Sequence, residues 1–136
     1  MTVPRRSTTQ TKGTETITMD MKQFSEKNRT RCESQNGFNH PLSSWTISDW
    51  FTATLGELGE AANIAKKLNR VRDGIRGNTE TEKQLRSNLA DELADTFIYL
   101  DLLAQSQGIV LADAVRLKFD KTSRKIGYRY ITVAAP

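Results

Sequence analysis

The chain has 136 residues, 37% of them hydrophobic and 26% charged, which is enough for one modest domain rather than two. Its apolar runs are too short to span a bilayer, and no apolar stretch follows Arg5 and Arg6, so neither a membrane helix nor a secretory signal is predicted. One cysteine (Cys32) and one histidine (His40) exclude an intrachain disulfide and an ordinary zinc site. We therefore expect a reducing cytoplasm, that of the host if the protein is viral, while the net charge of +4 suits an anionic partner, either a nucleic acid or a free phosphate compound.

The first part of the chain offers little to bury. Residues 1–18 are rich in Thr, Ser, Arg and Lys, so a disordered or extended tail is expected there. A few apolar residues among many charges then predict a short, weakly amphipathic helix from Met19 to about Glu33. Asn-Gly and His-Pro mark a loop over Ser34–Ser44. The compact domain is expected over residues 19–128, and residues 129–136 form a tail that either pairs as a short strand or simply packs.

Three longer helices follow in the prediction. The first covers about Ser48–Asn69, with its opening serine as the expected N-cap. The second covers about Glu80–Ser106, preceded by a capping box in Thr79–Glu82 and ended by Gly108. The third covers about Leu111–Lys125. The sequence thus predicts an all-α fold, a helical hairpin plus a third helix, in which oligomerisation completes a core like that of a four-helix bundle.

Two pairs of acidic residues fall on or beside the apolar faces of the hairpin helices. At about 100° per residue, Glu57 lies within about 40° of Trp50, and Glu92 lies within about 40° of Leu85 and Tyr99. A rise of 1.5 Å per residue puts the first pair about 14–18 Å and the second pair about 18–23 Å from the hairpin turn, so antiparallel packing brings them side by side. The four residues are Glu57, Glu60, Glu92 and Asp95. We expect them to be buried together.

Such a cluster needs a cation. Burying one unpaired carboxylate costs several kcal/mol, and four together repel one another. No arginine falls near these positions on either helix, so a metal ion is the expected compensator. Oxygen ligands without histidine favour Mg²⁺, with Mn²⁺ as a substitute, and Mg²⁺ keeps open positions for water and phosphate oxygens. A di-iron bundle would use Glu-x-x-His, whereas His40 lies in a loop. We interpret Gly56 and Gly59 as allowing close approach of the two helices.

The stretch "GELGEAANIAKKL" followed by "ELADTFIYLDLL" resembles the Glu-x-x-Glu … Glu-x-x-Asp signature of the MazG-like, all-α nucleoside triphosphate pyrophosphohydrolases. The match covers roughly residues 45–128, about three fifths of the chain, and is closest to the small single-domain members common in phages. Trp50 before the first motif, "KK" after it, Tyr99 in the second helix and "KF" at 118–119 make the resemblance more specific than two acidic pairs alone.

The resemblance implies hydrolysis of a (deoxy)nucleoside triphosphate between its α- and β-phosphates, giving a monophosphate and pyrophosphate, for nucleotide-pool control or house-cleaning. It implies that Mg²⁺ is held by the four acidic residues, which are also the catalytic ones, with Glu57 or Glu60 orienting or deprotonating the water. It also implies a homodimer or homotetramer. The residues expected to contact the substrate are Trp50, Asn63, Lys67, Tyr99, Lys118 and Arg124.

Two features depart from the family pattern. The 31 residues between Glu60 and Glu92 exceed the gap in many members, and the basic stretch "RVRDGIRGN" accounts for the excess. Asp120 stands where many members carry Asn after the Lys-Phe pair. His40 and Cys32 are interpreted as structural or incidental.

Three other readings remain open at the level of sequence. The chain is alternatively a basic helical module that binds nucleic acid or protein, a catalytically silent oligomeric scaffold, or a Mg²⁺-dependent phosphohydrolase that releases orthophosphate. The first accounts for the positive charge but gives no reason to bury four carboxylates, so a nucleic-acid partner is not favoured, and no membrane partner is expected.

Overall fold

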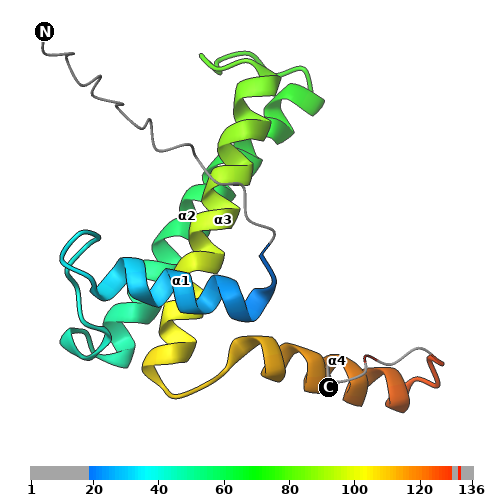
Figure 1. Cartoon of the computed structure of the whole chain (residues 1–136). Coiled ribbons are helices and arrows are strands. Elements are labelled where there is room, and N and C mark those ends of the chain that lie inside the picture. Colours follow the sequence, from blue (N-terminus) through cyan, green and yellow to red (C-terminus); the bar gives the residue numbers. More distant parts are fainter. Residues whose placement is uncertain (1–18, 130–131, 133–136) are drawn as a thin grey trace, which may run out of the picture.

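The structure is a computed structural model that describes residues 19–129 and Thr132 (Figure 1). These residues form four α-helices and one 3₁₀ helix, without a strand among them, which confirms the all-α prediction. The predicted N-terminal tail and almost all of the predicted C-terminal tail lie outside the described residues. The elements are α1 (Met21–Glu33), η1 (Leu42–Ser44), α2 (Ile47–Arg72), α3 (Glu82–Ser106) and α4 (Leu111–Lys125).

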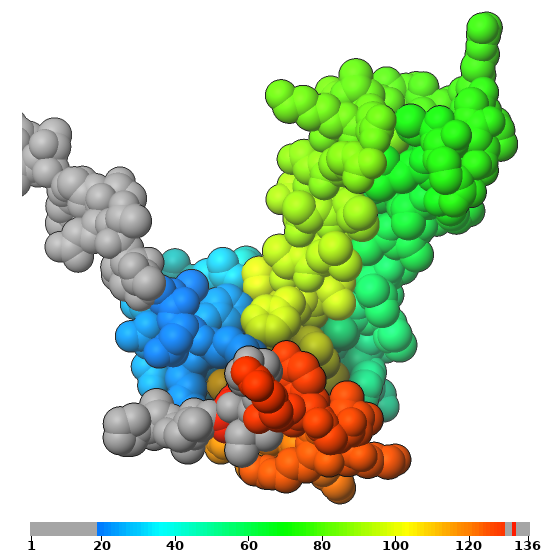
Figure 2. All heavy atoms as spheres, turned by 90° about the vertical axis from the view of Figure 1, so that its right-hand side faces the viewer, coloured from blue at the N-terminus to red at the C-terminus, as the bar shows by residue number. Residues whose placement is uncertain are grey.

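The two longest helices, α2 and α3, form the predicted antiparallel hairpin, and their contact is the most extensive in the molecule. Trp50, Thr54 and Ala61 from α2 and Leu85 from α3 are buried. The turn end of the hairpin stands clear of the other helices (Figures 1 and 2). Among the helices of the described residues, none combines the length and apolar composition of a membrane span.

Both hairpin helices begin at a capping box, but not at the predicted one. α2 is capped by Thr46 rather than Ser48: the Asp49 N–H donates to Thr46 Oγ1 at 3.3 Å, and the Thr46 N–H donates to the Asp49 carboxylate at 2.8 Å. α3 is capped by Thr81, which pairs with Gln84, so the box predicted in Thr79–Glu82 is wrong. Glu80, the predicted first residue of the helix, lies before it and forms an ion pair with Lys67 of α2. The helix therefore begins at the second of two competing threonine signals.

The first helix, α1, packs across the lower half of α3. Phe24 of α1 contacts Phe97 of α3, with ring centroids 5.5 Å apart. At the end of α1, Cys32 joins the main core, in which the buried residues are Cys32, Leu42, Trp50, Leu102 and Leu103. α1 and η1 therefore close one side of the hairpin near its lower end.

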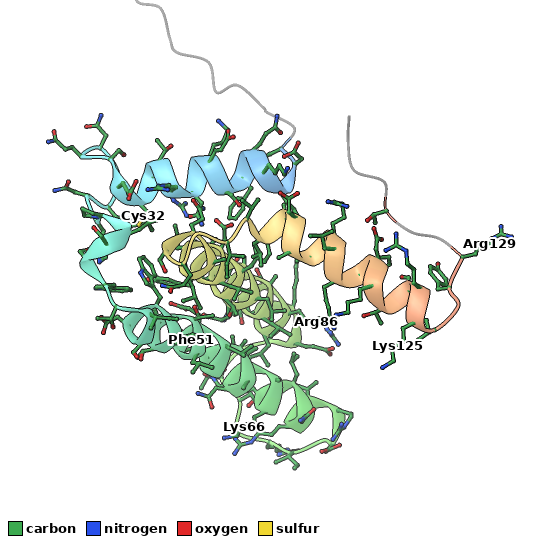
Figure 3. The ribbon with its side chains drawn as sticks, turned by 90° about the horizontal axis from the view of Figure 1, so that it is seen from below. Cys32, Phe51, Lys66, Arg86, Lys125 and Arg129 are labelled. Carbon is green, nitrogen blue, oxygen red and sulfur yellow. The ribbon has the colours of Figure 1, made fainter. Side chains whose placement is uncertain are left out.

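The last helix, α4, leaves the lower end of α3 through a turn at Gly108, whose φ of 70° favours glycine, and extends away from α1 and the hairpin (Figure 1). Lys22 of α1 forms an ion pair with Asp113 in the first turn of α4, at 3.1 Å. In Figure 3, Cys32 and Lys125 mark opposite sides of the molecule. The far part of α4 is thus remote from the core around Cys32.

The two glycines of "GELGE" do not bring α2 and α3 together. A Cβ atom added to Gly56 or Gly59 would meet no atom within 4 Å, and both residues are exposed. Their positions on the helix point away from α3, because the buried side of α2 is the one that carries Trp50 and Ala61. The interpretation that these glycines permit close approach is therefore wrong within one chain.

Candidate active site

The predicted register of the hairpin is confirmed. Carboxylate oxygens of Glu57, Glu92 and Asp95 lie within 4.8 Å of one another, an arrangement that could hold a metal ion. Glu60 lies outside this group of three but close enough for its charge to act on Glu92. We call these four residues the acidic cluster.

The acidic cluster is less buried than the sequence predicts. Glu57 and Glu92 are half-buried, whereas Glu60 and Asp95 are exposed. On a helix the latter two lie at the edges of the apolar arcs, and α1 and η1 cover only the lower part of the hairpin, so their carboxylates reach solvent. The expectation of four buried carboxylates is wrong for these two. The cluster is open on one side to water and to a ligand.

Within the described residues, no ion pair compensates the negative charge of the cluster. Burial first, and then the charges of Glu60 and Glu57, raise the pKa of Glu92 above its ordinary value. In the described part of the chain, no lysine, arginine or histidine forms an ion pair with any of the four carboxylates. The negative charge of the site is therefore left to solvent or to a bound cation.

A pocket of about 520 Å³ opens beside the cluster, and Glu57 and Asp95 belong to its lining. This volume lies within the range of small-molecule sites, roughly 300–1,000 Å³. Five aromatic side chains line the pocket: Phe38, His40, Trp45, Trp50 and Tyr99. Rings of this kind stack on a planar ligand such as a nucleobase.

The aromatic side chains of the pocket pack against one another around a buried Trp50. Trp50 is 1% exposed, and its indole N–H donates to the Leu42 carbonyl at 3.2 Å. The Trp45 ring centroid lies 4.7 Å from that of Trp50 and 4.6 Å from that of His40. Tyr99 lies 6.4 Å from Trp50, and burial followed by the charges of two cluster carboxylates raises its pKa. The sequence predicted Trp50 and Tyr99 at the site and missed the loop residues Trp45 and His40, whose only signal is an aromatic-rich His-Pro loop before a helix.

Part of the pocket wall comes from α1, a helix to which the sequence analysis assigned no functional role. Asn28, Arg31 and Cys32 line the pocket from this helix. The Arg31 guanidinium lies over the Phe38 ring, 5.6 Å from its centroid. Cys32 is buried, its Sγ donates to the His40 carbonyl at 3.2 Å, and burial raises the pKa of its thiol, which agrees with a structural role.

Four predicted substrate contacts are not brought to the pocket within one chain. Lys67 forms an ion pair with Glu80 at the turn end of the hairpin. Asn63 is exposed on α2 and is not part of the pocket wall. Lys118 and Arg124 belong to α4, which extends away from the hairpin (Figure 1).

Comparisons with known proteins identify no relative: no protein-family model matches the chain, and neither a curated protein nor a solved structure matches it significantly. A function must therefore be argued from the motif and from the geometry. The geometry supplies two adjoining features, an uncompensated acidic cluster and an aromatic pocket, which share Glu57 and Asp95.

Proposed function

We propose that the protein is a Mg²⁺-dependent nucleoside triphosphate pyrophosphohydrolase that converts a (deoxy)nucleoside triphosphate into its monophosphate and pyrophosphate. The observation that carries the proposal is the continuity of the acidic cluster with the aromatic pocket. A nucleotide has the matching construction, a planar base at one end and metal-binding phosphates at the other. The resemblance to the MazG-like signature, which contains the same four acidic residues, supports the same assignment.

The donor set suits the proposed ion. Mg²⁺ prefers oxygen ligands and is commonly bound through a few carboxylates together with substrate phosphates, with Mn²⁺ accepting a similar set. Glu57, Glu92 and Asp95 offer such oxygens, and Glu60 adds negative charge beside them. Bound Mg²⁺ would supply a water of lowered pKa and would neutralise charge that develops on the phosphates.

The chain's own residues then have defined tasks. The exposed carboxylate of Glu60, or that of Glu57, accepts the proton of the attacking water. Trp50 and Tyr99 hold the base and the sugar against the pocket wall. Both tasks follow from position, because Glu57 and Asp95 of the cluster line the same pocket as the two rings.

We further propose that the protein works as a homodimer or homotetramer in the cytoplasm, where a reduced Cys32 is maintained. The hairpin exposes large apolar side chains to water, which is unfavourable unless another surface covers them. We call these side chains the apolar face: Phe51, Leu55, Leu58, Leu93 and Leu100. A second copy that packs its own hairpin there completes a four-helix bundle. The phosphate-binding roles of Lys118 and Arg124 then require α4 of a second copy, because α4 of the same chain extends away.

The test is a product analysis. The purified protein is incubated with each common NTP and dNTP plus Mg²⁺, and the products are separated. We expect monophosphate and pyrophosphate from the wild type and from Asp91→Asn, which removes an exposed charge from α3 outside the cluster, and no product from Glu92→Gln.

Other products or behaviours select the other readings. Diphosphate with orthophosphate would move the cleaved bond and indicate a phosphohydrolase of another type. Salt-dependent binding of DNA that survives Glu92→Gln, without hydrolysis, would indicate a nucleic-acid-binding module. Metal binding without turnover of any nucleotide would indicate a scaffold.

A further inference from the structure

Asn28 is the most enclosed polar side chain of the pocket wall, with 3% of its surface exposed. Its amide nitrogen donates to the Ile98 carbonyl at 3.0 Å and to Asp101 Oδ2 at 2.9 Å. Both partners accept hydrogen bonds, so an amide turned the other way would place oxygen against oxygen. The orientation of the Asn28 amide is therefore fixed.

Asp101 is the anchor of this arrangement. It is 1% exposed, and it accepts hydrogen bonds from Ser25 Oγ and, at 2.9 Å, from Gln105 Nε2 as well as from Asn28. Gln105 also donates to the Ser25 carbonyl at 2.9 Å, which ties α3 to α1 a second time. Asp101 is thus a positioning residue that holds Asn28 in place.

The oxygen of the same amide remains available. No hydrogen-bond donor in the described part of the chain reaches Asn28 Oδ1. In that part, the one fully buried side-chain oxygen or nitrogen without a partner is Asn78 Oδ1, so Asn28 Oδ1 is not fully buried. Of the two pockets, Asn28 lines only the aromatic one. Asn28 thus offers the pocket a fixed, neutral hydrogen-bond acceptor.

The position of this acceptor relative to the acidic cluster suits the far edge of a base. The two partners of Asn28, Ile98 and Asp101, follow Asp95 by three and six residues on α3. The corresponding rise is about 4.5–9 Å, on the order of the span of a sugar and a base. One turn beyond Asn28 on α1, Arg31 adds a group that only donates. A base edge that combines an N–H donor with a neighbouring acceptor fits this pair.

We propose that the pocket selects bases that carry an exocyclic amino group on the edge opposite the sugar, namely cytosine and adenine, through Asn28 Oδ1. The inference rests on the proposed function, which places the phosphates at the acidic cluster and hence turns position 4 of a pyrimidine, or position 6 of a purine, toward Asn28. The oxo counterparts, uracil and hypoxanthine, place a carbonyl oxygen opposite Asn28 Oδ1. Neither that carbonyl oxygen nor Asn28 Oδ1 then has a hydrogen-bond donor. The discrimination expected for one such unpaired contact is about 10- to 100-fold in affinity.

The experiment measures binding without requiring hydrolysis. The chain has two tryptophans, and both line the pocket, so quenching of their fluorescence reports its occupation. The full-length protein is titrated with matched monophosphates, dCMP against dUMP and dAMP against dIMP. We expect the amino member of each pair to bind at least about tenfold more tightly. Equal affinities, or a preference for the oxo member, would overturn the inference.

Two further measurements assign the effect to Asn28. Asn28→Ala should bring both affinity ratios close to one, whereas Asn69→Ala, which changes an exposed asparagine on α2 far from the pocket, should leave them unchanged. If Asn28→Ala fails to fold, the wild type is titrated with the deoxynucleotide of 2-pyrimidinone, which lacks any group at position 4. This ligand should bind more weakly than dCMP and no more weakly than dUMP. An affinity equal to that of dCMP would contradict a role for the amino group.

Failure of the inference and failure of the proposed function remain distinguishable. Hydrolysis of triphosphates without an amino preference would leave the enzyme in place and overturn only the role of Asn28. The expected binding ratios without any hydrolysis would support the base selection and contradict the enzymatic proposal. No quenching by any nucleotide would overturn the inference.

Discussion

At the scale of single residues, the acidic cluster is a site whose charge works against the fold that holds it. The pKa of Glu92 is raised because burial and the neighbouring glutamates disfavour its charged form. A group with a pKa raised in the folded state stabilises the fold only where it is protonated. The contribution of Glu92 to folding stability is therefore complete at low pH. It is lost as the pH rises through 4.5, the ordinary pKa of a glutamate, and past the raised pKa of the folded state.

This sign predicts that Glu92→Gln stabilises the metal-free protein at neutral pH. Glutamine keeps the size of the side chain and removes the repulsion. Thermal unfolding should be followed against pH in the presence of a chelator, with Asp91→Asn as the control. The advantage of Glu92→Gln should vanish at acid pH and grow above 4.5. A constant difference across all pH values would contradict the repulsion account.

Addition of Mg²⁺ should reverse the order of stability, so that the wild type becomes more stable than Glu92→Gln. An ion that binds only the folded state stabilises it by about 2.7 kcal/mol at a hundredfold excess over its Kd. The wild type and Asp91→Asn should show this gain in chemical denaturation, and Glu92→Gln should show little of it. An equal gain in all three would place the bound ion outside the acidic cluster.

At the scale of elements, the start of α3 offers a sharp comparison between two threonines. Thr81 Oγ1 accepts the Gln84 N–H at 3.2 Å, whereas the Thr79 hydroxyl donates to the half-buried Glu80 side chain. Thr81→Ala should cost about 1 kcal/mol of unfolding free energy, and Thr79→Ala should be close to neutral. Urea denaturation measures both. The reverse order would restore the cap that the sequence predicted.

The network that joins α1 to α3 should be worth more than a cap. Asp101→Ala leaves the donors of Ser25, Asn28 and Gln105 without their common acceptor. Because an unsatisfied buried group costs about 1–3 kcal/mol, we expect a total loss of about 2–4 kcal/mol in urea denaturation. Asp91→Ala, on an exposed position of the same helix, should change stability by less than about 0.5 kcal/mol. A small effect of Asp101→Ala would show that α1 is held by its apolar contacts alone.

These elements also show what a sequence can predict here. The helices were predictable, and so was the proximity of Glu57 to Glu92 and Asp95, because helical periodicity and hairpin length fix which residues face one another. The caps were not predictable. Near the start of α3, Thr79 and Thr81 are each followed three residues later by a residue that completes a capping box, and near the start of α2 both Thr46 and Ser48 are of a type that caps helices. The pocket was predicted only in part: Asn28 and Trp45 come from segments whose packing against α3 no local pattern specifies.

At the scale of the whole molecule, the apolar face is the feature that one chain leaves unexplained. Leu55 and Leu58 follow Phe51 by four and seven residues, and Leu100 follows Leu93 by seven, so each set forms a stripe on its helix. Both stripes are turned away from the acidic pair of their own helix. The hairpin therefore has an acidic side, which we propose binds the ion and the substrate, and an apolar side, which we propose binds a second copy of the chain.

Association through this face makes a direct prediction about mass. A carboxylate in the centre of an apolar interface costs several kcal/mol, so Leu55→Glu combined with Leu93→Glu should give a monomer of 15.3 kDa by light scattering, whereas the wild type should have twice or four times that mass. Ile75→Glu is the matched control, since Ile75 is 56% exposed but lies in the hairpin turn. It should keep the wild-type mass. A monomeric wild type would leave the apolar face without its second copy, and an oligomer that survives the double variant would place the interface elsewhere, most simply on the apolar side chains of α4.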